Sequence, residues 1–431
     1  MKFLFAALFF AALMVSTSLH ADESRRDFPV GVYASWELAN AYADQNGLPL
    51  REFLDSCLAK CRENGVNALW VTNIGVEDLP LVQEVCRKHS IRLLANACEG
   101  RVDSYFADEA SPLREQVKRM REAASAELDY WIISDEPDVK HAEHLRQYVG
   151  ILRETDPARH RAFVVTHHMI DALVGKVPVE MAAVDPYPFF GPDDPNGPHT
   201  DASSIAHFRG VGEHFVRVCR AAGVEPWLMP QAFAEIWGGY RYDGDGMLYA
   251  RPGAYLHWIT PTVEQIRWQV FESIRQGAQG IVFFQLYPPM LPSFGNQEMP
   301  DVPWKEVLLK EGKAAGFGGL LTVHGKSTPQ LAELGRIFPL LRKYSELLLG
   351  ALPAERVPKW LGDTPASVCV AAFRQPVGHK VFLVLVNDNF NQPSSVGVLR
   401  SDLRDLVSGK MVGAALELPP GGGAILIQGS E

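Results

Sequence analysis

The sequence alternates short apolar segments with longer amphipathic segments, and this alternation repeats eight times. The short segments are almost continuously apolar, which is typical of strands that helices cover on both faces. They span residues 28–36, 68–74, 92–98, 130–136, 162–168, 181–187, 226–233 and 280–287. Eight units of strand followed by helix predict a single (β/α)8 barrel.

The segments between the expected strands carry helix start signals, in which a polar capping residue stands beside an early proline. These signals are Asp78-Leu79-Pro80, Ser111-Pro112, Thr260-Pro261 and Thr328-Pro329. We expect the last helix over residues 328–349, before Gly350. A doubly wound open sheet is the alternative fold, but no glycine-rich phosphate-binding turn follows the first strand.

The sequence after Gly350 loses its helical periodicity and consists of short apolar runs separated by turn residues. Strands are expected over residues 367–373, 380–386 and 424–428. This pattern predicts a small β-sandwich, and because its strands carry few aromatic residues we interpret it as a structural cap on the barrel. The expected division is a leader at 1–21, the barrel at 22–352 and the sandwich at 353–431.

The amino terminus has the pattern of a secretory signal peptide. Lys2 precedes an apolar run over residues 3–15, and small and polar residues follow up to Ala21. The run is shorter than the ~20 residues that span a bilayer. We therefore expect a secreted or periplasmic protein with a cleaved leader and no membrane insertion.

The net charge limits which classes of partner the protein can bind, and the cysteine spacing indicates the role of the cysteines. The 41 basic against 51 acidic side chains give a net charge of −10, which argues against nucleic acid as a partner. Six cysteines show no CxxC spacing; Cys57 and Cys61 lie four apart on an expected helix, where buried apolar packing is the simplest interpretation. No motif indicates a cofactor, and no feature specifies an oligomeric state.

The carboxyl ends of the expected strands combine carboxylates, amides and aromatic rings. In barrels of this type the functional site forms where the strands end. Such a mixture suits a sugar, whose hydroxyl groups need polar partners and whose C–H faces stack on aromatic rings. We predict that substrate contacts come from Trp36, Asn73, Asn96, His167, Tyr187, Gln231, Trp237, Gln285 and Tyr287.

Two short motifs at these ends resemble those of a known superfamily. Asp135-Glu136-Pro137 closes the fourth strand, and Asp185-Pro186-Tyr187-Pro188 closes the sixth. Together with the barrel order and the terminal sandwich, they resemble the clan-A glycoside hydrolases. The resemblance implies that Glu136 is the general acid/base and that the substrate is an oligo- or polysaccharide.

The chain departs from that superfamily at two positions. Asp135 replaces its asparagine, and Gln231 stands where the nucleophilic glutamate is expected at the end of strand seven. A carboxamide cannot form a glycosyl ester, so another group must assist Glu136. The candidates are Glu235 near the end of strand seven, Asp185 as a base that activates water, Asp135 as a group that orients the substrate's own acetamido group, and Glu37 at the end of strand one.

Two other functions remain open at this stage. A carbohydrate-binding barrel without catalysis would explain Gln231, since it binds sugars but needs no nucleophile. A metal-dependent hydrolase would explain His167-His168 and the acidic strand ends. No set of metal ligands is predicted, because neither a His-x-His nor an HExxH pattern occurs at the expected positions.

Overall fold

A computed structural model describes most of the chain. The described residues are 27–98, 110–125, 128–192, 194–237, 240–242, 248–250, 255–289, 307–308, 314–315 and 318–429. The expected leader at 1–21 lies outside them. Within the described residues no helix combines the length and apolar character needed to cross a membrane.

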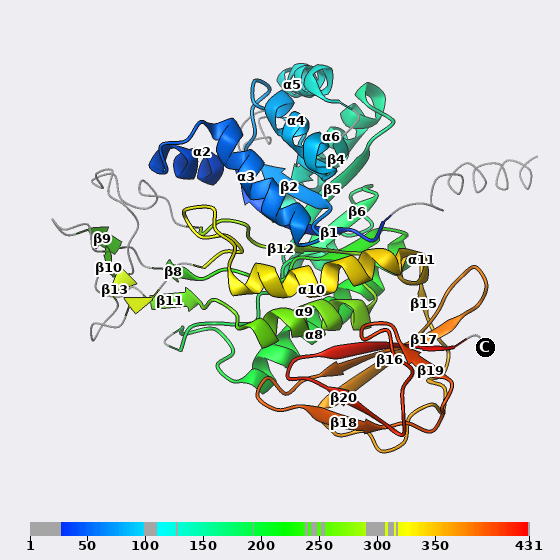
Figure 1. The fold of residues 1–431 in the computed structure, drawn as a ribbon. Helices are drawn as coiled ribbons and strands as arrows, with labels where there is room; N and C mark the ends of the chain where they lie inside the picture. Colours follow the sequence, from blue (N-terminus) through cyan, green and yellow to red (C-terminus); the bar gives the residue numbers. More distant parts are fainter. Residues whose placement is uncertain are drawn as a thin grey trace, which may run out of the picture.

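Eight parallel strands close into a barrel, which confirms the predicted fold class (Figure 1). The strands are β1 (Val30–Ser35), β2 (Ala68–Thr72), β3 (Arg92–Asn96), β4 (Leu128–Ser134), β5 (His160–Val165), β6 (Met181–Val184), β7 (Glu225–Leu228) and β12 (Gly280–Phe283). Neighbours along the chain pair in parallel, and β12 pairs with both β7 and β1 to close the ring. Each predicted strand contains or overlaps one barrel strand.

The observed strands end earlier than predicted, most clearly at β6 and β7. The prediction extended these segments to residues 187 and 233, whereas the regular ladder ends at Val184 and Leu228. The following residues remain apolar because they pack at the barrel mouth. Their backbone is no longer part of the β-sheet hydrogen-bond ladder. The alternation of a strand therefore does not predict whether these side chains point into the barrel or away from it.

Helices surround the barrel. They are α2 (Trp36–Gln45), α3 (Leu50–Glu63), α4 (Leu79–His89), α5 (Ala110–Ala123), α6 (Ala142–Thr155), α7 (Ile170–Leu173), α8 (Asp201–Ala222), α9 (Val263–Gln276), α10 (Pro329–Lys343) and α11 (Ser345–Leu348). Asp78 and Thr328 occupy the predicted N-cap positions of α4 and α10. The prediction for α9 was off by two residues, because Thr262 forms a capping box with Gln265.

The predicted last helix is two helices. α10 ends at Lys343, and Tyr344 adopts a non-helical conformation before α11 begins. Gly350 follows with φ 67°, a left-handed conformation that glycine adopts without steric cost. The apolar period continues through both helices because both pack on the barrel, so periodicity alone does not show the break.

Large side chains fill the barrel interior. The inner cluster comprises Tyr33, Ala68, Trp70, Leu94, Tyr130, Ile132, Ala162, Val164, Met181, Ala183, Trp227, Met229 and Val282. Trp70 and Trp227 are fully buried. Each such side chain contributes on the order of 1.5–3 kcal/mol by burial. The barrel interior is therefore a packed core that leaves no room for a ligand between its strands.

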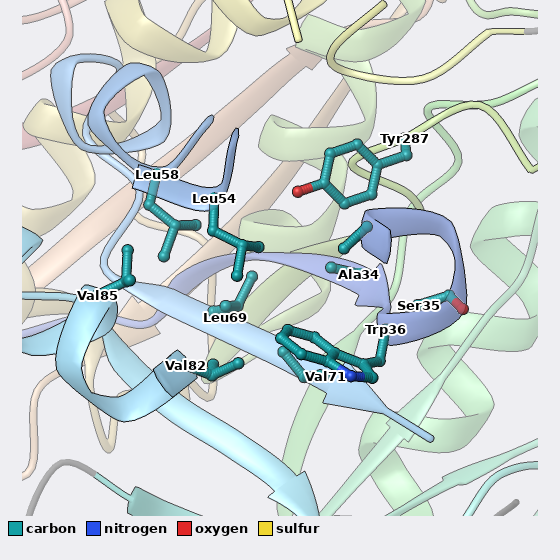
Figure 2. Close-up of a pocket in the computed structure, with 11 residues that line it drawn as sticks. Ala34, Ser35, Trp36, Leu54, Leu58, Leu69, Val71, Val82, Val85 and Tyr287 are labelled. Carbon is teal, nitrogen blue, oxygen red and sulfur yellow. The ribbon is translucent and has the colours of Figure 1, made fainter. Parts of the chain in front are cut away.

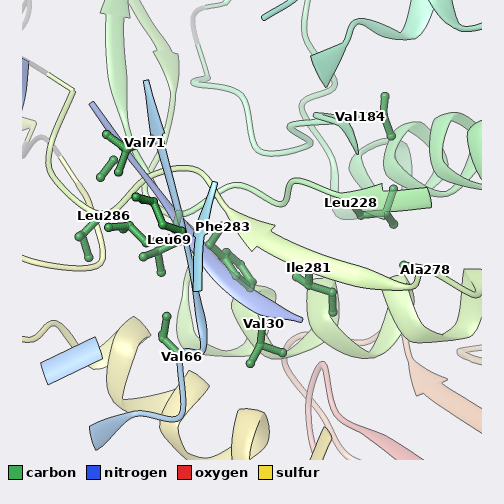
Figure 3. Packing of buried hydrophobic residues seen from close by; sticks show 14 of the residues in the cluster. Val30, Val66, Leu69, Val71, Val184, Leu228, Ala278, Ile281, Phe283 and Leu286 are labelled. Carbon is green, nitrogen blue, oxygen red and sulfur yellow. The ribbon is translucent and has the colours of Figure 1, made fainter. Parts of the chain in front are cut away.

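A second apolar layer joins the outside of the strands to the helices. Val30, Leu69, Val71, Ile281 and Phe283 point outward from β1, β2 and β12 into this layer (Figure 3). Five of the six cysteines, Cys57, Cys61, Cys86, Cys98 and Cys219, are fully buried here. Their burial supports the interpretation of Cys57 and Cys61 as packing residues.

A small apolar cavity lies in this layer, between β1, β2, α3 and α4. Figure 2 shows Leu54 and Leu58 of α3 facing Val82 and Val85 of α4 across it. Its volume is about 10 Å³, close to the minimum that holds one water molecule. An apolar space of this size is a gap in packing and not a substrate pocket.

The C-terminal part forms the predicted small β-sandwich. One sheet contains β15 (Leu352–Pro353), β16 (Val368–Arg374), β17 (Val381–Asn387), β21 (Gly423–Gln428) and β19 (Leu403–Asp405), and β18 (Ser394–Gly397) pairs with β20 (Ala415–Leu418). The large sheet packs against α9 (Figure 1). Arg209 of α8 joins the two parts, because it donates to both Glu272 of α9 and Asp388 of the sandwich.

A hairpin rises from the mouth after β7. Its strands are β8 (Glu235–Trp237) and β11 (Tyr255–Trp258), which pair antiparallel. Beyond it, β9 (Tyr240–Tyr242), β10 (Leu248–Ala250), β13 (Val307–Leu308) and β14 (Ala314–Ala315) form a small sheet at the left of Figure 1.

Candidate active site

The end of β4 presents two adjacent carboxylates at the barrel mouth. Asp135 is half-buried and Glu136 is exposed. Glu136 has φ 49°, and its backbone N–H donates to Val164 of β5 at 3.2 Å. A left-handed backbone at a residue other than glycine costs about 1–3 kcal/mol and persists where the surrounding structure enforces it. Such strain concentrates at functional sites, so this conformation marks Glu136 as a candidate.

The end of β6 brings a third carboxyl group to the same place. Asp185 directly follows β6, and its side chain is in hydrogen-bond contact with that of Glu136. Burial raises the pKa of Asp185 well above its ordinary value, and the charge of Glu136, this hydrogen bond and the charge of Asp135 raise it further. Two carboxyl groups in contact share one proton, because both cannot ionise at low cost.

Tyr33 of β1 orients Asp135, another member of this carboxyl cluster. Its hydroxyl donates to Asp135 Oδ2 at 3.0 Å and lies 2.8 Å from Thr72 Oγ1 of β2. Burial, followed by the charge of Asp135, raises the pKa of Tyr33 well above its ordinary value. We did not predict Tyr33 from the sequence. The available signal was a tyrosine among the inward-facing positions of the first strand.

Aromatic rings line one side of the carboxyl cluster. The ring of Tyr187 lies 5.5 Å from Phe284, 5.0 Å from Phe233 and 5.5 Å from Trp258, measured between centroids. Burial, followed by the charge of Asp185, raises the pKa of the Tyr187 hydroxyl well above its ordinary value. Tyr187 is therefore where the sequence placed it, beside the carboxylates.

Glu235 lies apart from the cluster of Asp135, Glu136 and Asp185. It is the first residue of β8, and burial raises its pKa to about 6, while a hydrogen bond from Trp237 acts in the opposite direction. None of the three clustered carboxyl groups contributes to this shift. The structure thus brings together three of the four predicted catalytic residues and places Glu235 on the neighbouring hairpin.

Gln231 is built into the wall of the mouth. Its side chain is fully buried, and its Oε1 accepts from Phe189 N at 2.9 Å. Its Nε2 donates to the carbonyl oxygens of Phe189, Phe233 and Ile259, at 3.1, 3.3 and 2.8 Å respectively. These contacts favour a structural role over the predicted role in substrate binding, because both amide hydrogens are already used.

Three other predicted amides lie at strand ends. Asn96 is fully buried, and its side chain bonds to both backbone groups of Ile74 at 3.0 Å, which ties the end of β3 to the end of β2. Asn73 is half-buried with φ 63°, a conformation that asparagine tolerates well. Gln285 is 2% exposed and follows the cis peptide bond after Phe284. Asn96 and Gln285 therefore have little surface to offer a substrate.

Two predicted aromatic contacts belong to the core instead of the mouth. Trp36 is 5% exposed, its indole donates to Asp78 at 2.7 Å, and it lines the small outer cavity with Tyr287 (Figure 2). Tyr287 is fully buried and stacks on Phe53 of α3. Both residues follow strand ends whose chain turns outward, so the geometry favours packing over substrate contact.

Histidines gather at the end of β5. The ring of His167 lies 3.5 Å from His168 and 5.8 Å from His207 of α8, between centroids. Desolvation, followed by the neighbouring histidines, lowers the pKa of His167 to about 4. Among the described residues, no group of three or more His, Cys, Asp or Glu side chains has a geometry that could hold a metal ion. The metal-dependent alternative thus lacks a ligand set in this part of the chain.

Comparison with known proteins gives structural matches alone. No protein-family model and no curated protein sequence matches the chain. The chain is similar to the β-galactosidase from Bacillus circulans sp. alkalophilus, with a TM-score of 0.61, 9% identity, and coverage of 93% of this chain and 99% of that chain.

Two further matches are weaker. The family 5 mannosidase from Rhizomucor miehei has a TM-score of 0.48 and 12% identity over 74% of this chain and 95% of that chain. The β-galactosidase from Marinomonas ef1 has a TM-score of 0.49 and 13% identity over 74% of this chain, which spans 60% of the length of that protein. At these identities the likeness shows the fold alone, and the (β/α)8 barrel of this chain is similar to that of the β-galactosidase from Bacillus circulans sp. alkalophilus.

Proposed function

We propose that this protein is a glycoside hydrolase that cleaves an oligo- or polysaccharide, with Glu136 as the general acid/base. The observation that carries the proposal is the contact between Glu136 and Asp185 at the barrel mouth. A general acid must hold a proton at working pH and must reach the leaving oxygen. The pair retains a proton at a pH where an isolated aspartate has lost it, and Glu136 is its exposed member.

The geometry also narrows the role of Asp185. A nucleophile in this chemistry stands about 5 Å from the acid, and a base that activates water stands about 6.5–9.5 Å away. Asp185 touches Glu136, which leaves no space for a sugar carbon or a water molecule between them. We therefore assign Asp185 to sharing the proton of Glu136, and not to activating water.

Asp135 is then the remaining carboxylate of the cluster. Tyr33 and Thr72 hold one side of it through the tyrosine hydroxyl, so its orientation is set before substrate binds. A preorganised carboxylate stabilises the positive charge that develops on the sugar in the transition state. The same position also suits orientation of a substrate acetamido group, as the sequence suggested.

The surroundings of the cluster support a carbohydrate substrate. Tyr187 and Phe284 place aromatic rings beside the carboxylates, where a sugar can stack its C–H face and donate its hydroxyl groups. The apolar leader at residues 1–21 supports export, and an exported enzyme of this kind would meet its polysaccharide outside the cytoplasm.

Hydrolysis of a broad panel of oligo- and polysaccharides tests the proposal. We expect turnover by the mature protein and a loss of about 10²- to 10⁴-fold in Glu136→Gln. Glu154→Gln, an exposed position on α6, serves as the matched control and should keep full activity. Equal turnover by the Glu136→Gln variant and the parent would show that the acid lies elsewhere.

A carbohydrate-binding protein without catalysis is the second candidate, and one observation favours it. Gln231, which stands where the nucleophile is expected, is a buried amide bonded to backbone, so the end of strand seven places no carboxylate at the barrel mouth from this position. This candidate predicts sugars that bind to the protein and are not cleaved. Binding without turnover across the same panel would support it and reject the hydrolase.

A further inference from the structure

The hairpin above the mouth exposes one flat aromatic face. Trp237 of β8 is 44% exposed, although a tryptophan usually buries most of its surface. One face of its indole rests on the imidazole of His257 from β11, with ring centroids 3.7 Å apart and planes inclined by 26°. The opposite face is therefore the one available to a ligand.

Asp194 fixes the orientation of the His257 imidazole, on which Trp237 stacks. His257 is 5% exposed, and its Nδ1 pairs with the buried carboxylate of Asp194. Asp194 also accepts from the backbone N–H groups of Asn196 and Gly197, each at 2.7 Å. Because both ends of this contact are anchored, His257 cannot turn away, and the plane of the indole is set in the free protein.

A carboxylate lies at the edge of the same ring. Trp237 donates a hydrogen bond to Glu235, which is half-buried two residues earlier on β8. A flat apolar face with a hydrogen-bond acceptor at its rim matches a pyranose ring, which has apolar C–H faces and hydroxyl groups around its edge. An aliphatic or planar aromatic ligand would use the face but would not use the remaining acceptor capacity of this carboxylate.

Aromatic contacts connect this face to the carboxyl cluster. The ring of Trp258 lies 5.6 Å from Trp237 and 5.5 Å from Tyr187, and Tyr187 is the ring beside Asp185. Two ring-to-ring steps therefore separate the exposed indole from the site of the proposed reaction. One or two sugar units of an extended chain span such a distance.

We propose that the open face of Trp237 binds a further sugar unit of the substrate, so that the protein acts on extended saccharides held at both the carboxyl cluster and the hairpin. The proposal rests on the proposed function. Glu235 then accepts hydroxyl groups at this second position and takes no part in bond cleavage. Asp194 and His257 are positioning residues, since they act on the saccharide only through Trp237.

Binding in an inactive background tests this inference without requiring turnover. Calorimetric titration of Glu136→Gln with pentasaccharides and disaccharides of glucose, galactose, mannose and N-acetylglucosamine would identify a saccharide that binds. Adding Trp237→Ala should weaken pentasaccharide binding roughly ten-fold, because a lost aromatic stack costs about 1.4 kcal/mol. Disaccharide binding should change far less.

Conservative variants separate stacking from a general loss of structure. Trp237→Phe keeps an aromatic face and should retain most of the affinity. Asp194→Asn keeps an acceptor for His257 and should match the parent, whereas Asp194→Ala should reproduce the effect of Trp237→Ala. If Trp237 and Asp194 had a merely structural role, these differences in affinity between the conservative variants and the alanine variants would not be expected.

Two results would overturn the inference. One is equal affinity of the Trp237→Ala variant and its parent for the pentasaccharide, and the other is an equal loss for disaccharide and pentasaccharide. Neither result bears on Glu136, because the proposed function is judged by turnover of the unsubstituted protein. Failure of turnover with a retained effect of Trp237→Ala would reject catalysis and leave the second sugar position in place.

Discussion

The carboxyl group of Asp185 contacts the carboxyl group of Glu136, although the two residues end different barrel strands. Burial, followed by the charge and the hydrogen bond of Glu136, raises the pKa of Asp185 well above its ordinary value. The contact also gives the exposed Glu136 a neighbour that shares a proton with it. The first prediction follows from this pair, and so does the part of the second that concerns Asp185.

The pH dependence of catalysis should move when the pair is broken. Asp185→Asn removes the carboxyl group whose pKa is raised by burial and by the charge of Glu136, so the pair no longer retains a proton at a pH where an isolated aspartate has lost it. We expect the basic limb of the kcat/KM profile to shift toward acid, with a lower maximum. The profile of Asp402→Asn, an exposed position on the sandwich, should match the parent. An unchanged basic limb in Asp185→Asn would show that the pair does not set it.

Stability should fall with rising pH because the folded state binds protons more tightly than the unfolded state at these carboxyl groups. A raised folded pKa contributes stability that is fully present below the unfolded value and is lost as the pH passes the folded value. For Glu235 this window runs from 4.5 to about 6. For Asp185 the window begins at 3.8 and extends upward.

Urea unfolding of Glu235→Gln measures this effect. The free energy of unfolding of the variant, relative to the parent, should rise by about 2 kcal/mol between pH 4.5 and pH 7, since a 1.5-unit shift corresponds to that amount. The free energy of unfolding of Asp185→Asn, relative to the parent, should also rise as the pH increases. A constant difference between parent and variant across this range would contradict the assignment.

Placing a glutamate at position 231, at the end of strand seven, should destabilise the protein and should not improve catalysis. Gln231→Glu would place a carboxylate against the three carbonyl oxygens that now accept from the amide. Losing these hydrogen bonds and burying an unpaired charge should cost on the order of 3 kcal/mol. Gln231→Met, which loses the bonds without adding a charge, should fall between parent and Gln231→Glu in thermal unfolding. Higher activity in Gln231→Glu would mean that the side chain reaches the substrate after all.

The sandwich should stabilise the barrel through one buried ionic contact. Arg209 bridges Glu272, which is fully buried, and Asp388, whose carboxylate also accepts from the indole of Trp268 at 2.9 Å. Asp388→Ala leaves this arginine with one partner fewer and should lower the free energy of unfolding by about 3 kcal/mol.

Calorimetry checks the role of this contact. Asp388→Asn keeps an acceptor for Trp268 and should lose less stability than Asp388→Ala. Asp402→Asn breaks an exposed pair with Arg400 and should have an effect below about 1 kcal/mol. Equal melting temperatures for Asp388→Ala and Asp402→Asn would show that the bridge contributes little.

The sequence by itself determined the eight strand–helix units, the C-terminal sandwich and the three carboxylates that meet at the mouth. Apolar periodicity is a local property, and the carboxyl ends of parallel barrel strands converge on one face, so Asp135, Glu136 and Asp185 were predictable. Only the tertiary structure decided what these side chains touch.

Three positions that differ from prediction follow the ends of strands: Trp36 and Tyr287 turn outward into the core, and Gln231 bonds to backbone. Tyr33, which the sequence did not single out, stays in the ladder of β1 and reaches Asp135 across the barrel. At such positions the direction of a side chain depends on backbone angles and on distant partners, which no local period encodes. The pairing of Trp237 with His257 has the same origin, because the two residues meet only when the hairpin closes.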